Sequence, residues 1–300
     1  MSKVVARIFG GLGNQLFIYA TARAIAHKNK ASLFLDTKTG FQNDSYQREF
    51  ALGNFCIQYK NANRLQSFDF PGGRFLKAFS RKFSKHLPQK NQYYYSDLSN
   101  PPIYFNQKIK DIKSKKSVWL EGYWQSPKYF EEIRDILIDE IKIKKEISKS
   151  SKEILENIKN TNSVCIHYRM LRNYINKIKV TDANELESNY FLQAIDIINS
   201  QIESPHFFVF SDNPAGVQQT LPNQNTFTFI SHNQVQGTDY EDFYLMQHCK
   251  HFILSNSTFG WWPAWLSQNE TKIVITPHID YWDNADILPA SWLQITPKNG

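Results

Sequence analysis

The sequence has few cysteines and no hydrophobic run long enough to cross a bilayer. Its three cysteines, Cys56, Cys165 and Cys249, are odd in number and widely spaced. This pattern excludes a disulfide framework and a paired metal-binding motif, and it is typical of a reducing compartment. We also expect no secretory signal peptide, because Arg7 interrupts the apolar N-terminal region. We therefore expect a cytoplasmic protein.

Two common phosphate-binding motifs are also absent from the glycine-rich stretch Gly10-Gly11-Leu12-Gly13-Asn14-Gln15-Leu16-Phe17. A dinucleotide fingerprint beginning at Gly11 would need a small residue where Leu16 stands, and the phosphate loop of nucleoside triphosphatases would need Lys followed by Ser or Thr. The stretch nevertheless joins the apolar residues 4–9 to a helical pattern. We expect a strand, a glycine turn and an amphipathic helix.

The glycine turn has two explanations that the sequence leaves open. Glycine lets the backbone approach a ligand closely, and a helix N-terminus favours an anion such as phosphate. Alternatively, the chain only needs a positive φ angle at this point. Asn14 and Gln15 favour a ligand, because their amides are able to donate to sugar or phosphate oxygens.

What the sequence has in quantity is aromatic residues and positive charge. Aromatic residues make up 15% of the 300 residues, and the formal net charge is +7. Aromatic faces suit sugar rings, although they also fill cores, and positive charge favours a nucleotide-sugar, a nucleic acid or an anionic membrane as partner. Residues 71–91 combine basic residues with Leu and Phe at helical spacing. They predict either a solvated surface helix or a helix on anionic lipid, whereas no motif supports nucleic-acid binding.

Polar residues repeatedly follow short apolar strands along the chain. In the first half, the strand beginning at Val118 leads to Ser126-Pro127, a typical helix start, and predicts a helix at Tyr129–Asp139. The expected strands of the second half are 163–167 with His167 and Arg169, 207–210 with Asp212, 227–230, 251–254 with Ser255, Ser257 and Thr258, and 272–276, which closes the sheet. This alternation predicts parallel sheets with ligands at their carboxyl ends, in two stacked α/β units with a cleft between them.

Five segments together resemble the bacterial α-1,2-fucosyltransferases of glycosyltransferase family 11, in order along nearly the whole chain. Two are specific as a pair: the segment 10–17, which reads Gly-Gly-Leu-Gly-Asn-Gln-Leu-Phe, and the segment 255–266, which begins Ser-Asn-Ser-Thr-Phe-x-Trp-Trp. The others are 120–130, 164–169 and 207–212. The resemblance implies an α/β, GT-B-like fold with two Rossmann-like domains facing a central cleft. We expect an acceptor-side domain at 1–145 and a GDP-sugar-binding domain at 146–300.

The resemblance also implies an enzyme, a galactoside 2-α-L-fucosyltransferase. It would move L-fucose from GDP-β-L-fucose to the 2-hydroxyl of a galactose-terminated oligosaccharide or glycolipid, with inversion and without a metal ion or cofactor. O-antigen biosynthesis in the cytoplasm is the expected setting, with peripheral contact to the inner membrane as a hypothesis. By this resemblance Arg169 and Asn14 are catalytic. The donor-binding residues are Gly10, Gly11, Gly13, His167, Asp212, Ser255, Ser257 and Thr258.

One motif departs from the family pattern. Where the family reads His-x-Arg-Arg-Gly-Asp-Tyr, this chain has Met170 in place of the second Arg, then Leu171, and Arg172 in place of the Asp. A transferase for a different nucleotide-sugar and an inactive carbohydrate-binding relative therefore remain alternatives. The base that deprotonates the acceptor also stays open: the candidates are a phosphate oxygen of the donor, Asp36, Glu121 and Asp239. The acceptor glycan depends on the loops 37–47 and 93–104.

Overall fold

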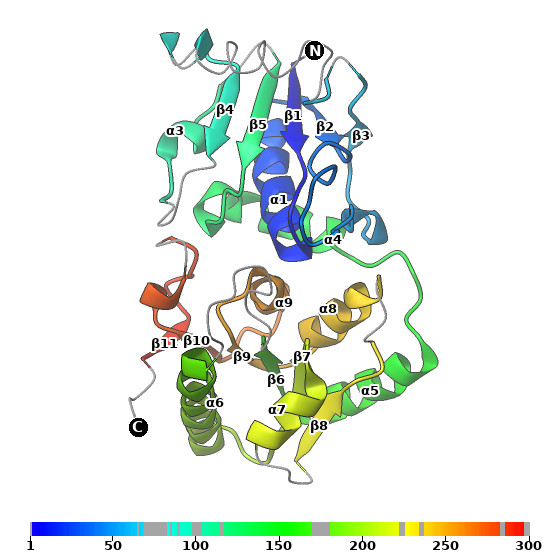
Figure 1. Ribbon diagram of the computed structural model, residues 1–300, viewed down its shortest axis with the longest axis vertical. Coiled ribbons are helices and arrows are strands. Elements are labelled where there is room, and N and C mark those ends of the chain that lie inside the picture. The colour runs from blue at the N-terminus through cyan, green and yellow to red at the C-terminus, as the bar shows by residue number, and fades with distance from the viewer. Residues whose placement is uncertain are drawn as a thin grey trace. The chain divides into compact units, whose positions relative to one another are not determined.

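The computed structural model describes residues 2–64, 66–68, 83–84, 86–88, 91–97, 104–113, 117–169, 181–221, 226–233, 237–282 and 286–296, with 181–187 as backbone. The chain divides into two compact units (Figure 1). Unit 1 is Met1–Lys144 with Asp283–Pro289, and unit 2 is Lys145–Trp282 with Ala290–Gly300. We predicted the domain boundary after residue 145 from the sequence. That prediction did not include the return of Asp283–Pro289 to unit 1.

Unit 1 contains a five-stranded sheet in the order β3-β2-β1-β5-β4, and every neighbouring pair is parallel. The strands are β1 (Lys3–Arg7), β2 (Ser32–Asp36), β3 (Lys60–Asn61), β4 (Tyr94–Asp97) and β5 (Val118–Gly122). The strand order reverses between β1 and β5. In open α/β sheets the carboxyl ends at such a reversal are where ligands bind.

Helix α1 (Leu12–Lys28) follows the glycine turn, and it is buried on almost all sides in its first three turns. It packs on β1 and β2, and also against the 3-10 turns η1 (Leu52–Asn54) and η3 (Pro127–Tyr129). The prediction of an amphipathic helix was therefore wrong. Apolar and small residues surround the helix axis here, so no face is left for solvent.

The predicted helix at Tyr129–Asp139 is broken into shorter pieces. Turn η3 and a second 3-10 turn, η4 (Glu131–Ile133), precede α4 (Arg134–Glu140), and α3 (Gln107–Lys110) is likewise short. Ser126 stands at the cap position of η3 with Pro127 after it, but its hydroxyl makes no capping hydrogen bond. Glu140 ties α4 to α1, because its carboxylate accepts from Tyr19 (2.5 Å) and from Arg23 (2.9 to 3.1 Å).

Unit 2 contains a six-stranded parallel sheet in the order β11-β10-β9-β6-β7-β8. Its strands are β6 (Asn162–Tyr168), β7 (Pro205–Ser211), β8 (Phe227–Ile230), β9 (His251–Leu254), β10 (Val274–Pro277) and β11 (Leu293–Ile295). Counted from β6, this is the 3-2-1-4-5-6 order of dinucleotide-binding folds, with the reversal between β6 and β9. Strand β11 adds an edge beyond β10, so the expectation that residues 272–276 close the sheet was wrong.

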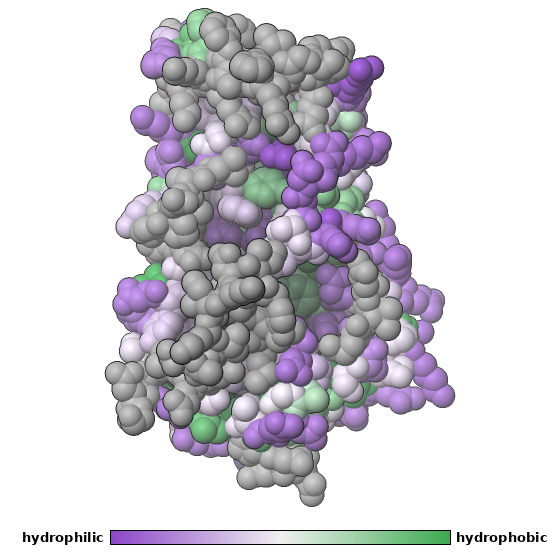
Figure 2. Space-filling view, in the orientation of Figure 1, coloured by the Kyte–Doolittle hydropathy of each residue, from purple (hydrophilic) through white to green (hydrophobic). Residues whose placement is uncertain are grey.

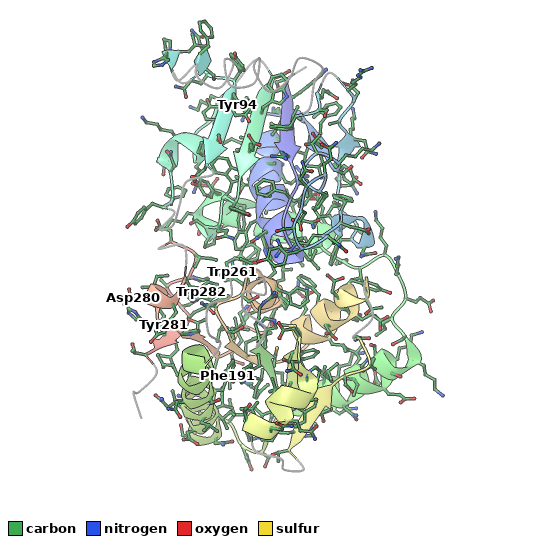
Figure 3. All side chains as sticks on the ribbon, in the orientation of Figure 1. Tyr94, Phe191, Trp261, Asp280, Tyr281 and Trp282 are labelled. Atoms are coloured by element: carbon green, nitrogen blue, oxygen red, sulfur yellow. The ribbon has the colours of Figure 1, made fainter. Side chains whose placement is uncertain are left out.

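The helices of unit 2 are α5 (Lys149–Asn160), α6 (Thr181–Gln201), α7 (Pro214–Thr220), α8 (Asp239–Gln247) and α9 (Thr258–Leu266), with the 3-10 turn η5 (Ile279–Tyr281) after β10. Helices α6 and α7 share a core with the even-numbered residues of β6. In it, Tyr168 stacks on Phe191 at 4.0 Å, and Tyr190 donates to the carbonyls of Leu254 (2.7 Å) and Ile275 (3.0 Å) (Figure 3). Helix α5 packs on α8, and α8 packs on α9.

The basic helix expected within 71–91 falls mainly outside the described residues, as do Met170, Leu171 and Arg172. In the part of the chain that is described, no helix combines the length and the apolar character that a membrane crossing requires. The face drawn in Figure 2 is mainly hydrophilic where it is coloured, and its hydrophobic residues occur in small groups.

Candidate active site

The glycine turn of unit 1 has one position that only glycine fits easily. Gly10 has a φ angle of +78°, and a Cβ there would lie 3.1 Å from Asn14 Nδ2. Gly11 is the cap residue of α1 with φ −71°, and the nearest atom to a Cβ there would be Arg48 Nε at 4.0 Å. Gly13 lies in the first turn of α1. The positive φ angle thus explains Gly10, while the space beside Gly11 is left open.

The side chain of Gln15 holds this turn in place. It is buried, donates to the carbonyls of Gly10 (2.9 Å) and Glu49 (2.8 Å), and accepts from the Ala51 amide (2.9 Å). Both amide hydrogens and the oxygen are therefore used by the backbone. Of the two amides expected to reach a ligand, Gln15 has a structural role instead.

Asn14 is held differently, by a residue that follows β5. Its Oδ1 accepts a 2.8 Å hydrogen bond from Gln125 Nε2, so α1 and β5 are joined on the two sides of the strand reversal. Trp124, just before Gln125, has a φ angle of +50°, and Ser126 N donates to Trp124 O at 2.8 Å. A left-handed conformation at a residue other than glycine costs about 1–3 kcal/mol, and such residues cluster at functional sites. No local pattern in the sequence signals this strained turn.

Both carboxylate oxygens of Asp36, one of the three candidate bases, are fully occupied by hydrogen bonds. It accepts from the backbone amides of Phe68 (2.7 Å), Thr39 (3.0 Å) and Lys38 (3.2 Å), and from the Thr39 hydroxyl (2.8 Å). Burial acts to raise its pKa, but these hydrogen bonds outweigh burial and lower the pKa below its ordinary value. Asp36 therefore fixes the loop after β2 and has no free lone pair directed at a substrate.

Glu121, the second candidate, is also a structural carboxylate. It is 1% exposed, accepts from Arg7 Nη1 at 2.7 Å, and accepts a short hydrogen bond from the hydroxyl of Tyr94 (Figure 3). Asp239, the third, opens α8 in unit 2, and burial raises its pKa. Asp239 and a phosphate oxygen of the donor therefore both stay predictions for the base.

In unit 2, His167 contacts the residue that follows β9 and also packs against α9. Its carbonyl accepts from Ser255 N at 3.0 Å, and its Nδ1 lies 3.2 Å from Ser255 Oγ. A Cβ on Gly260 would lie 2.6 Å from the same Nδ1, so only glycine allows α9 to come this close. Ser255 is 2% exposed and serves to position the ring. Direct contact of His167 and Ser255 with a donor stays a prediction.

Arg169 and Asp212, both predicted site residues, lie together. Strands β6 and β7 are in register at Tyr168 and Ser211, so the next residue of each leaves the sheet at the same edge. Arg169 Nε is 3.8 Å from Asp212 Oδ2, with 45% and 27% of the two side chains exposed. The pair presents a forked cation and a carboxylate at the carboxyl edge of the sheet.

Ser257 and Thr258 open α9 on the other side of the strand reversal. Ser257 is the cap residue, with its hydroxyl accepting from Phe259 N at 3.4 Å, and Thr258 is the first helical residue. Asn256 donates to the carbonyl of Tyr281, which joins this turn to η5 (Figure 3). Because helix N-termini favour anions, this turn suits a phosphate group, as does the guanidinium of Arg169. Phosphate binding by these residues stays a prediction.

The structure thus assembles the predicted residues in two groups, one per unit. Gly10, Gly11, Gly13 and Asn14 lie at the β1/β5 reversal. At the β6/β9 reversal lie His167, Arg169, Ser255, Ser257 and Thr258, and Asp212 follows the neighbouring strand β7. Sequence reasoning placed Trp124 at the end of a strand but did not predict its positive φ angle. It missed the close approach at Gly260 and the position of Arg48 beside Gly11. Among the described residues, no three His, Cys, Asp or Glu side chains are placed to hold a metal ion.

Two Rossmann-like units, each with its polar residues at a strand reversal, define a GT-B-like α/β protein. Solved structures agree with this fold. A NodZ α-1,6-fucosyltransferase soaked with GDP-fucose is 14% identical and matches 93% of this chain and 96% of its own, with a TM-score of 0.59. The fucosyltransferase NodZ from Bradyrhizobium, also 14% identical, matches 87% and 91% with a TM-score of 0.55.

The family model of Glycosyl transferase family 11 matches residues 3–294. The chain belongs to this family and is a glycosyltransferase, which confirms the resemblance seen in its motifs. An α-1,2-colitosyltransferase of Escherichia coli is 30% identical over 305 residues, 98% of this chain and 99% of the relative. The O-antigen biosynthesis glycosyltransferase WbnK of Escherichia coli is 26% identical (95% and 98%), and galactoside α-(1,2)-fucosyltransferase 2 of Pongo pygmaeus is 23% identical (87% and 68%).

Proposed function

We propose that the protein transfers L-fucose from GDP-β-L-fucose to the 2-hydroxyl of a galactose residue and forms an α-1,2 linkage. The observation that carries this proposal is the pairing of Arg169 with Asp212 at the edge where Ser257 and Thr258 open α9. A cation and a helix N-terminus at the reversal of a 3-2-1-4-5-6 sheet suit a nucleotide diphosphate. The family membership and the α-1,2 relatives support the linkage, and the relatives that are fucosyltransferases support fucose as the sugar.

In this proposal Arg169 neutralises the charge that develops on the departing GDP. A permanently charged, forked guanidinium is well suited to a diphosphate, and such stabilisation acts most strongly in the transition state. Ser257 and Thr258 bind the same phosphates. Asp212 follows the second strand of the sheet, the position from which a carboxylate reaches a ribose hydroxyl in dinucleotide-binding folds.

Unit 1 would supply the acceptor side, with Asn14 and the glycine turn as its ligand-contacting groups. The reaction would invert the anomeric carbon without a metal ion, as the resemblance implies. Asp239 or an oxygen of the departing phosphate would take the proton of the acceptor hydroxyl. We place the reaction in the cytoplasm, in O-antigen biosynthesis, with contact to the inner membrane as a further hypothesis.

A second candidate donor is GDP-colitose, because the relative with 30% identity is a colitosyltransferase. Colitose is fucose without its 3-hydroxyl, so the choice between the two depends on how the site treats one hydroxyl group. If a buried polar group of the site forms a hydrogen bond with that hydroxyl, the same group has no partner when colitose is bound. The enzyme would then favour GDP-fucose over GDP-colitose by about 10-fold or more. Met170 and Arg172, which depart from the family motif, are the residues to exchange if colitose is preferred.

The test is a donor screen with the purified protein, lactose as acceptor, and mass spectrometry of the product. We expect a deoxyhexose to be added from GDP-fucose, with product formed equally in the presence of a metal chelator. A hexose product from another nucleotide-sugar would overturn the donor assignment. Glycan binding without any release of GDP would instead support a carbohydrate-binding protein without catalysis.

A further inference from the structure

Several polar and aromatic side chains at the β1/β5 reversal of unit 1 have no role in the proposed transfer as described so far. They come from the loop after β2 and from the turn after β5. This loop lies directly on the glycine turn, since a Cβ on Gly40 would sit 1.9 Å from the carbonyl oxygen of Ile8 and 2.7 Å from Phe9 Cβ. Residues distant in the sequence are thereby brought to one edge of the sheet.

Arg48 is the positively charged group of this loop that borders the glycine turn. Its guanidinium lies 4.1 Å from the ring centre of Tyr46, and its Nη1 lies 3.8 Å from Asp44 Oδ2. Asp44 Oδ1 accepts from the amides of Tyr46 (2.9 Å) and Arg48 (3.2 Å), which fixes the loop before any ligand arrives. Arg48 Nε also borders the open space beside Gly11, 4.0 Å from where a Cβ would be.

Tyr123 faces the same groups from the other side of the reversal. Its ring packs on Phe9 with 4.9 Å between ring centres. Burial raises the pKa of Tyr123, while Arg48 acts to lower it and Asp44 to raise it, so the phenol lies within electrostatic reach of both. Two residues further on, Gln125 holds Asn14.

Three polar atoms here have no hydrogen-bond partner in the described part of the chain: Tyr123 Oη, Gln125 Oε1 and Asn14 Nδ2. They offer a hydroxyl, an acceptor and a donor. The charge of Arg48 is offset by Asp44, so the group as a whole is close to neutral. A neutral, mixed set of donors and acceptors beside aromatic rings matches the hydroxyls and apolar face of a sugar ring, and it does not match a phosphate.

We propose that Tyr46, Arg48, Tyr123 and Gln125 form the subsite for a neutral hexose of the acceptor, with Arg48 and Tyr123 as its specificity-determining residues. The inference rests on the proposed glycosyl transfer and names the part of unit 1 that recognises the acceptor. Arg48 and Gln125 bind ring hydroxyls, Tyr123 donates a further hydrogen bond, and Tyr46 covers one side of the ring. The acceptor is thereby placed beside Asn14.

The test compares steady-state kinetics of Arg48→Ala, Arg48→Lys and Tyr123→Phe with the wild type, using GDP-fucose and lactose. We expect KM for lactose to rise about 10- to 100-fold in Arg48→Ala and about 5- to 10-fold in Tyr123→Phe, the losses expected for charged and neutral hydrogen bonds. KM for GDP-fucose should stay within about twofold. Arg64→Ala and Tyr59→Phe are matched controls, because Arg64 is exposed and Tyr59 precedes β3, at the opposite end of the sheet.

Two results would overturn the inference. One is a KM for lactose within about twofold of the wild type in both Arg48→Ala and Tyr123→Phe, and the other is a matching rise in KM for GDP-fucose, which would assign these residues to the donor. Arg48→Lys and Tyr123→Phe keep the charge and the ring, so they provide the answer if Arg48→Ala does not fold. A wild type without transfer from any nucleotide-sugar would show instead that the proposed function has failed; lactose binding, measured by calorimetry in the same variants, then decides the inference.

Discussion

The two strand reversals of this protein use opposite chemistry on the same architecture. In unit 1, the β1/β5 edge presents amides, a phenol and an Arg48–Asp44 pair around a backbone turn that Gln15 holds. In unit 2, the β6/β9 edge presents Arg169 with 45% of its side chain exposed, and hydroxyls at a helix N-terminus. The first suits a neutral sugar and the second suits an anion, as a transferase with a charged donor and an uncharged acceptor requires.

Arg169 is the residue on which the expected anion-binding character of the unit 2 edge depends most strongly. Replacing it by Ala should lower kcat/KM by about 100- to 1000-fold, because the developing charge on GDP loses its main cation. Steady-state rates of GDP release measure the effect. Arg64→Ala, an exposed arginine of unit 1, is the control. A loss below about threefold would mean that the charged edge of unit 2 does not carry the donor.

One carboxylate in each unit extends the contrast to stability. Asp36 in unit 1 has a lowered pKa, so its stabilisation is present above the unfolded pKa near 4 and is lost as the pH falls through the lower folded value. In unit 2, burial raises the pKa of Asp242 to about 7, although Asn233 Nδ2 donates to it at 2.8 Å. The folded state then binds the extra proton, so this group destabilises the fold as the pH rises from about 4 to 7.

The two Asp→Asn variants should therefore change stability in opposite directions. In urea denaturation at pH 8, Asp36→Asn should lose about 2–4 kcal/mol, because several hydrogen bonds to a charged acceptor are weakened. Asp242→Asn should be more stable than the wild type at this pH, and its advantage should shrink as the pH is lowered towards 4. Equal losses in both variants at pH 8 would refute the assignment of opposite roles.

Gly260 tests how closely α9 must approach β6. A Cβ there would lie 2.6 Å from His167 Nδ1, so Gly260→Ala should displace the ring or the helix and cost about 1–3 kcal/mol in urea denaturation. The same shift moves Thr258, so KM for GDP-fucose should rise as well. Gly53→Ala, where the nearest atom to a Cβ would be 3.8 Å away, is the control. Unchanged stability and KM in Gly260→Ala would show that the contact is not tight.

The smallest change in stability is expected for substitutions in the glycine turn, where Gly10 and Gly11 should differ from each other. Gly10→Ala forces a non-glycine residue to a φ angle of +78° and should cost about 1–2 kcal/mol. Gly11→Ala has an ordinary φ angle of −71° and should leave stability almost unchanged. Its new methyl group would instead border Arg48 and raise KM for lactose. Equal destabilisation of both variants in urea would contradict this division of roles.

The sequence predicted the parts of the fold that local pattern determines. Strands such as 227–230 and 251–254 were predicted with the right ends, because a short apolar run bounded by polar residues has few other solutions. Helix α1 was misjudged since its pattern does not show that η1 and η3 cover its outer sides. Strand β11 was missed because three residues at an edge carry little signal.

In the candidate site, too, the sequence predicted the residues that a local pattern marks and did not predict those that depend on contacts between distant segments. The glycine turn, Arg169 and Asp212 were predicted because polar residues at strand ends and the family motifs mark them. The positioning contacts were not, since the roles of Gln15, Gly260 and Trp124 follow from backbone geometry that brings distant segments together. Arg48 carries no local signal at all, and only the packing of the loop after β2 on the turn places it beside Gly11.

The most direct test of the account is the affinity for GDP, measured by calorimetry in the wild type, Arg169→Ala and Arg48→Ala. The diphosphate is expected at the charged edge of unit 2 and a neutral sugar at the edge of unit 1. GDP binding should therefore be about 10- to 100-fold weaker in Arg169→Ala and unchanged in Arg48→Ala. Wild-type affinity in Arg169→Ala, or an equal loss in both variants, would contradict the account.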